Sequence, residues 1–150
     1  MIYIKVRFEN RDSFNVVGYA VETNLDSAVE DIGLLCEKYE KKLLKLANKN
    51  PLYGVMRYTE NHNYFYLIGI EDNEGLVEKK LDNPISLTIP STTFAIATPP
   101  KNMDLIEAWT IYFESKLPNL GYVPDSDHGI YFESHNDDGV CELWTPIKKE

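Results

Sequence analysis

The chain has 150 residues, of which 43% are hydrophobic, and this is the size and composition of one ordinary domain that buries its own core. Its formal net charge of −9, from 24 acidic and 15 basic residues, argues against nucleic acid as a partner, because phosphate binding needs a basic surface. Two cysteines without metal-ligand spacing, three scattered histidines and no long apolar run predict a cytoplasmic protein with no metal, no cofactor and no membrane association.

The first half of the chain is predicted to form two strands, a helix and two more strands. Alternating apolar and polar residues predict the strands, and apolar residues that recur every three or four positions predict the helix. Ser27 and Glu30 form a capping box at the helix start, and residues 48–51, which end in a proline, stop it. The expected elements are strands at 2–8 and 14–21, a helix at 28–47, and strands at 53–59 and 64–71, the last two joined by a turn at 60–63.

The second half repeats this pattern after a polar connector at residues 72–83. Asp104 and Glu107 form a second capping box, which starts a helix that runs to about Lys116. That helix is apolar around most of its circumference, so it should contact other parts of the protein on two sides. The expected elements are strands at 85–89 and 93–98, a helix at 105–116, and a final hairpin at 129–134 and 140–147.

Matching stretches in the two halves predict an α+β fold made by internal duplication. Residues 17–20 align with residues 94–97, and Gly54-Val55 aligns with Gly129-Ile130. Two β-α-β-β modules, with halves at about 1–75 and 84–150, would then pair about a pseudo-twofold axis, with the helices on one side and a ligand cleft on the other. The alternative is an ordinary α+β pattern without a true repeat.

One acid, Glu142, interrupts the apolar strand at 140–147. Strand alternation places it on the same face as Val140 and Trp144, and the repeat aligns it with Leu67 of an all-apolar strand. A buried carboxylate beside aromatic rings would attract a cation, whereas an exposed strand glutamate would have no such role. Both readings remain open here. On the second helix, Trp109 and Tyr112 face either the cleft or a core against the other half.

Five short motifs in the right order resemble the GyrI-like superfamily, the effector-binding domain of AraC-type and MerR-type multidrug regulators. They extend over about residues 14–148. They are Val16-Val17-Gly18, Tyr53-Gly54-Val55, Ile89-Pro90, Glu107-Ala108-Trp109 with Leu117-Pro118 and Gly121-Tyr122, and the segment from Cys141 to Ile147.

The resemblance implies a central cleft for amphipathic, cationic and aromatic small molecules. It assigns the buried glutamate of the family to Glu142. It assigns the aromatic wall to Trp109, Tyr112, Tyr58, Tyr66 and Trp144. We expect a stand-alone member, without a DNA-binding module, that binds small molecules. The alternatives are a hydrolase of reactive cyclopropane-bearing compounds that uses a Glu/Tyr pair, or a DNA gyrase inhibitor. A regulator or gyrase is therefore the possible protein partner.

Overall fold

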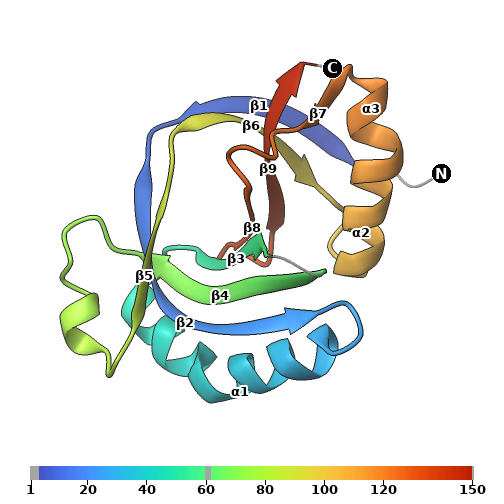
Figure 1. The fold of residues 1–150 in the computed structure, drawn as a ribbon. Coiled ribbons are helices and arrows are strands. Elements are labelled where there is room, and N and C mark those ends of the chain that lie inside the picture. The colour runs from blue at the N-terminus through green and yellow to red at the C-terminus, as the bar shows by residue number, and fades with distance from the viewer. Residues whose placement is uncertain (1–3, 60–61, 150) are drawn as a thin grey trace.

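A computed structural model describes residues 4–59 and 62–149, and shows an α+β fold built on one curved antiparallel sheet (Figure 1). The strands are β1 (Lys5–Arg11), β2 (Phe14–Asn24), β3 (Leu52–Tyr58), β4 (Asn63–Glu71), β5 (Ile85–Ile89), β6 (Thr92–Thr98), β7 (Tyr122–Pro124), β8 (Ile130–His135) and β9 (Cys141–Lys149). The helical elements are α1 (Ala28–Ala47), η1 (Glu78–Lys80), α2 (Leu105–Ile111), η2 (Tyr112–Lys116) and α3 (Leu117–Asn119). None of the described helices is long and apolar enough to cross a membrane.

The strand order is β1-β6-β9-β8-β3-β4-β2-β5, with β7 paired to β9. This order is symmetrical about the central β3–β8 pair, with β4 corresponding to β9 and β2 to β6, as two related modules would require. That the two modules superpose stays a prediction. The end strands are exchanged, because β1 pairs with β6 of the second half and β5 pairs with β2 of the first. Two-residue links join β1 to β2 and β5 to β6, so the two ends of the curved sheet meet at one corner (Figure 1).

Local sequence patterns predicted all of these strands except β7, and both long helices. Three details differ. The Ser27 side chain makes no capping bond, and the Asn24 side chain instead accepts from the backbone N–H of Ser27 at 3.0 Å. Asp104 does cap α2, accepting from the N–H of Glu107 at 3.2 Å. The second helix widens into the π-helical turn η2. Residues 2, 3, 60 and 61 of the predicted elements lie outside the described residues.

Apolar side chains pack on both faces of the sheet. On the helix face, α1 packs over β2 and β4 through Leu35 and Leu43, while α2 and the turns that follow it pack over β6 and β9. The other face, which we call the inner face, carries a cluster with no helix residue. Its members are Phe14, Val16, Tyr53, Val55, Leu67, Ile89, Phe94, Ile96, Ile130, Phe132 and Trp144. Because apolar side chains cover both faces of the sheet, a ligand site needs a part of the helix face that the helices leave open.

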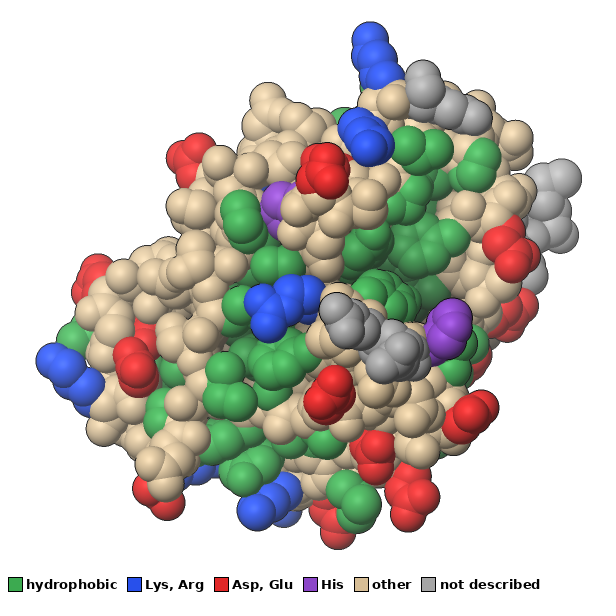
Figure 2. Space-filling view, in the orientation of Figure 1, with side chains coloured by type: hydrophobic (Ala, Val, Ile, Leu, Met, Phe, Trp, Pro, Cys, Tyr) green, Lys and Arg blue, Asp and Glu red, His purple; other side chains and the backbone are tan. Residues whose placement is uncertain are grey.

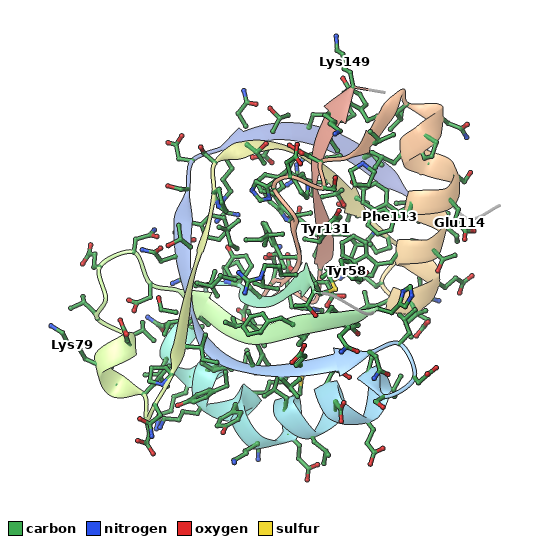
Figure 3. All side chains as sticks on the ribbon, in the orientation of Figure 1. Tyr58, Lys79, Phe113, Glu114, Tyr131 and Lys149 are labelled. Carbon is green, nitrogen blue, oxygen red and sulfur yellow. The ribbon has the colours of Figure 1, made fainter. Side chains whose placement is uncertain are left out.

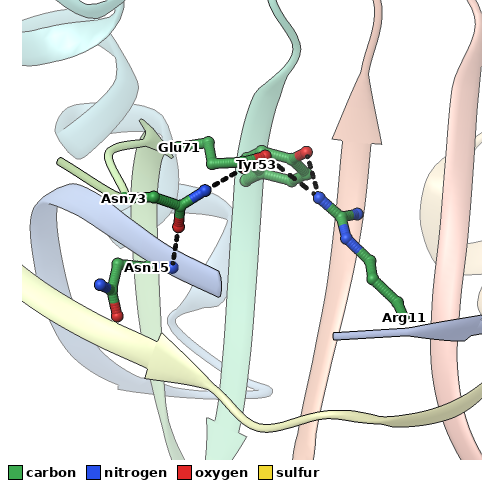
Figure 4. A network of polar contacts seen from close by, with 5 residues as sticks. All are labelled: Arg11, Asn15, Tyr53, Glu71 and Asn73. Carbon is green, nitrogen blue, oxygen red and sulfur yellow. Dashed lines mark hydrogen bonds and ion pairs between the residues drawn. The ribbon is translucent and has the colours of Figure 1, made fainter. Parts of the chain in front are cut away.

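Arg11 closes the inner face at the corner between β1 and β2. Its guanidinium lies 3.7 Å from the centroid of the Phe14 ring, donates to the Tyr53 hydroxyl at 3.2 Å and pairs with Glu71 at 3.1 Å (Figure 4). Asn73 extends the network by donating to Glu71. A charge at the edge of an apolar cluster is stable when it is paired and stacked on rings, so Arg11 seals this cluster.

Candidate ligand-binding cleft

A cleft of about 1020 Å³ lies on the helix face, between α1 and α2 and over the central strands β3, β4 and β8. This volume is at the upper end of the range for small-molecule sites. Figure 2 shows hydrophobic side chains gathered in a hollow on one face of the molecule. The expectation that the cleft would lie opposite the helices is wrong. The helix α1 packs on β2 and β4, and α2 packs on β6 and β9, which leaves the central strands β3 and β8 open between the two helices.

Apolar helix residues that do not reach the sheet surround the mouth of the cleft. Val29 and Leu44 on α1 are 75% and 48% exposed, and Ile106 on α2 is 65% exposed. These residues explain why both helices are apolar over more of their surface than sheet packing needs. The cleft therefore has an apolar entrance on both sides.

Seven aromatic residues line the cleft, and they are Tyr53, Tyr58, Tyr64, Tyr66, Trp109, Phe113 and Tyr131. Several of them hold each other edge to face. The Tyr131 ring lies 5.9 Å from Tyr58 and 5.9 Å from Phe113, at interplanar angles of 87° and 85° (Figure 3). Such contacts fix the rings in place, so the wall is formed before any ligand arrives.

The floor of the cleft carries one buried carboxylate, Glu133 on β8, which is 7% exposed. Its Oε2 accepts from the indole N–H of Trp109 at 2.9 Å, and its Oε1 contacts Nε2 of His135 at 3.3 Å. Across the strand pair it faces Gly54, whose missing side chain makes the room. A Cβ added to Gly54 would lie 2.2 Å from the Tyr66 hydroxyl and 3.3 Å from Glu133 Oε1.

The charges in the cleft are mostly negative. Among the described lining residues there are three carboxylates, Glu40, Glu114 and Glu133, and no lysine or arginine. Interactions with the Cys141 side chain, and then with the Glu133 carboxylate, raise the pKa of His135 to about 10. Burial raises the pKa of Tyr66, so its hydroxyl stays protonated at neutral pH. The cleft thus offers a cation negative charge and aromatic faces.

Three of the residues predicted for the site line this cleft: Trp109, Tyr58 and Tyr66. Two do not line it. Tyr112 is fully buried under α2, beside Leu143, and Trp144 is buried on the inner face, where it stacks on Phe132 with the ring centroids 5.1 Å apart. The resemblance assigned both to the aromatic wall of the cleft, with a core position as the alternative for Tyr112, and the sequence could not say on which side of the sheet they lie.

Glu142, the predicted carboxylate, also lies away from the cleft. It follows the alternation of Trp144 on β9 and so belongs to the inner face, where its Oε2 pairs with Nη1 of Arg7 at 2.7 Å. Its side chain is 16% exposed, so this is a partly buried ion pair at the edge of the sheet. The correction follows from the sheet register. Glu142 lies opposite Ser134 rather than Glu133, and adjacent positions on a strand face opposite sides.

Glu133 lies in the cleft, and the sequence analysis did not single it out. The sequence contained a signal for it, because Glu133 alternates with apolar residues such as Phe132 along its strand. Glu142 is placed in the same way in the next strand. Each is an acid in a largely apolar strand. Only the pairing of β8 with β3 and β9 shows which of the two faces the cleft.

The fold and the cleft define a class: an α+β effector-binding domain, with a ligand-sized cavity between two helices on one sheet. A family model described as Cass2, integron-associated effector binding protein, matches residues 7–147. The chain therefore belongs to this family, and the resemblance to GyrI-like effector-binding domains is confirmed. Among curated proteins no match was found.

Solved structures share the fold at low sequence identity. The integron cassette protein VCH_CASS2 from the mobile metagenome of Vibrio cholerae has a TM-score of 0.73 at 19% identity, with 98% of this chain and 99% of that chain covered. SAV2435, solved with bound tetraphenylphosphonium, has a TM-score of 0.69 at 16% identity, with 96% and 94% covered. The C-terminal domain of EcmrR has a TM-score of 0.60 at 14% identity, with 98% and 99% covered.

Proposed function

We propose that this protein binds amphipathic organic cations in the cleft between α1 and α2, with Glu133 as the carboxylate that selects positive charge. One observation carries the proposal. Glu133 is buried at the floor of an aromatic cleft, and among the described residues its ion-pair partner is His135, whose side chain is partly exposed, and not a lysine or arginine. A buried carboxylate in such a setting gains from a counter-charge.

The aromatic wall supports the same assignment. The Tyr66 and Trp109 side chains approach the carboxylate from two sides, through the space over Gly54 and through the indole hydrogen bond. Ring faces add about 0.5 to 2 kcal/mol for each cation contact. The apolar mouth suits a ligand that is large and hydrophobic around its charge. That SAV2435, with the same fold, was solved with the lipophilic cation tetraphenylphosphonium is consistent with this choice.

The test compares a cation with a neutral molecule of similar shape, methyltriphenylphosphonium and triphenylphosphine oxide, by calorimetric titration. Glu133→Gln keeps an oxygen for the Trp109 N–H and removes the charge. This variant should weaken the binding of the cation by about 1.5 to 3 kcal/mol, roughly 10- to 150-fold, and leave the binding of the neutral compound nearly unchanged. Glu142→Gln is the matched control on the inner face and should affect neither. Equal losses for both compounds in Glu133→Gln would refute charge selection by this residue.

A second function, hydrolysis of reactive cyclopropane-bearing compounds, is favoured by the convergence of Glu133 and Tyr66 over Gly54. In that reaction Glu133 would take a proton from water while the water oxygen bonds to a carbon of the strained ring. The C–C bond of that carbon would break, and its electron pair would pass to the activating group of the compound, which takes up a proton from solvent. The Tyr66 hydroxyl would orient the reactants. Incubation with such an electrophile, followed by mass spectrometry, should then show the addition of one water to the compound. That product should be lost in Glu133→Gln and reduced in Tyr66→Phe. If mass spectrometry shows the compound unchanged, the protein does not hydrolyse that compound.

A further inference from the structure

His135 places a charge inside the cleft that cation binding alone does not explain. It is the last residue of β8, two positions after Glu133, and its ring lines the same cleft. Its Nε2 lies 3.3 Å from Glu133 Oε1, whereas the other oxygen is taken by the indole of Trp109. Among the described lining residues, His135 is the one side chain that can carry positive charge near neutral pH.

We propose that the His135 imidazolium is the internal counter-ion of Glu133, which a cationic ligand displaces, so that cation binding releases a proton. This inference rests on the proposed function and adds a specificity-determining residue to it. A ligand cation that reaches the open side of Glu133 meets the imidazolium already in contact with that carboxylate. Like charges so close repel, so the ring either loses its proton to solvent or swings away.

The geometry permits this exchange. The Glu133 side chain is 10% exposed and held by Trp109, but the His135 side chain is 39% exposed and sits at a strand end. The carboxylate therefore stays in place while the imidazole has room to move. Displacing it needs no rearrangement of the sheet.

Two titratable groups contact the ring, Glu133 on its own strand and Cys141 on β9. The other titratable groups that line the same cleft are Cys36 and Glu40 on α1, the tyrosines on β3, β4 and β8, and Glu114 on the turn after α2. Contacts with Cys141 and Glu133 raise the pKa of His135 to about 10, so the ring is charged at pH 8 in the free protein. When a cation takes over Glu133, the pKa of His135 loses the contribution of that carboxylate, and it returns towards its ordinary value near 6.5 only where the ring also leaves Cys141, the larger contributor. At pH 8 each bound cation should therefore release between a fraction of a proton and about one proton to the buffer.

The experiment is calorimetry with methyltriphenylphosphonium, whose charge is permanent, at pH 8 in two buffers of different ionisation enthalpy. The wild type should release a measurable fraction of a proton per cation, up to about one, and cation affinity should rise with pH between about 7 and 9. Triphenylphosphine oxide should release none. The His135→Gln variant should release no proton when it binds the cation. At pH 7 it should bind the cation about two- to fivefold more tightly than the wild type does, the range for a partly exposed ion pair. His62→Asn, at an exposed position outside the cleft lining, is the control and should behave as wild type.

The outcomes separate this inference from the proposed function. If Glu133→Gln loses cation selectivity but the wild type releases no proton, the counter-ion role of His135 is refuted and the binding proposal stands. If the wild type releases protons that persist in His135→Gln, another group titrates and the inference also fails. If Glu133→Gln binds both probes as the wild type does, the binding proposal itself is refuted. If the wild type releases no proton, the inference is refuted without any variant. If the wild type does release protons and His135→Gln folds poorly, His135→Asn takes its place in the same measurement.

Discussion

Gly54→Ala tests the close packing at the cleft floor most directly. The new Cβ would lie 2.2 Å from the Tyr66 hydroxyl oxygen and 2.9 Å from the ring carbon that carries it, closer than real Cβ atoms come. Tyr66 is 7% exposed and cannot swing into solvent without losing its packing. Overpacking of this kind costs about 1 to 3 kcal/mol. The loss of glycine flexibility in the unfolded chain offsets about 0.5 to 1 kcal/mol of this.

The expected net destabilisation is about 1 to 2 kcal/mol, which lowers the melting temperature by roughly 2 to 8 °C in a chain of this size. Because the methyl group also reaches within 3.3 Å of Glu133 Oε1, the affinity for methyltriphenylphosphonium should fall about tenfold or more. Differential scanning calorimetry and the titration above measure the two effects.

Gly33→Ala is the matched control. Gly33 lies in α1 with nothing within 4 Å of an added Cβ, so the same change should stabilise the protein by about 0.5 to 1 kcal/mol. If Gly54→Ala melts at the wild-type temperature and binds the cation unchanged, Tyr66 and Glu133 are not packed over Gly54 as described.

Two further predictions concern stability. Asp104→Ala removes the cap of α2 and should lower the free energy of unfolding by about 0.5 to 2 kcal/mol in urea titrations. Ser27→Ala is the control, because the Ser27 side chain makes no capping bond, and its free energy of unfolding should stay within about 0.5 kcal/mol of the wild type. Equal losses in the two variants would contradict the assigned caps. The raised pKa of His135 stabilises the folded state fully below about pH 6.5, and this contribution is lost as pH rises towards about 10. Because the His135 side chain is 39% exposed, this loss of stability should be at most about 1 kcal/mol. It is measured as the fall in the urea midpoint between pH 7 and pH 10, which should be larger in the wild type than in His135→Gln. An equal fall in both proteins would contradict the prediction.

Local pattern was enough to predict most of the fold. The alternation in β2 and the three-to-four spacing in α1 depend only on neighbours along the chain, and the structure places both elements where these patterns are. Asp104 was recognised as a cap for the same reason, because its partner, the N–H of Glu107, is three residues away. The same logic failed at Ser27, where Asn24, three residues before it, accepts the bonds instead.

The sequence by itself indicated the class of the protein, an α+β effector-binding domain. The tertiary structure decided which of two similar carboxylates lies in the cleft. Glu133 and Glu142 look alike in sequence, as acids in neighbouring strands of one hairpin. Their faces depend on how β8 pairs with β3 and β9, and on α1 and α2 leaving the central strands open. A shift of one residue in strand register exchanges the two faces of a strand, and register is set by contacts between distant segments.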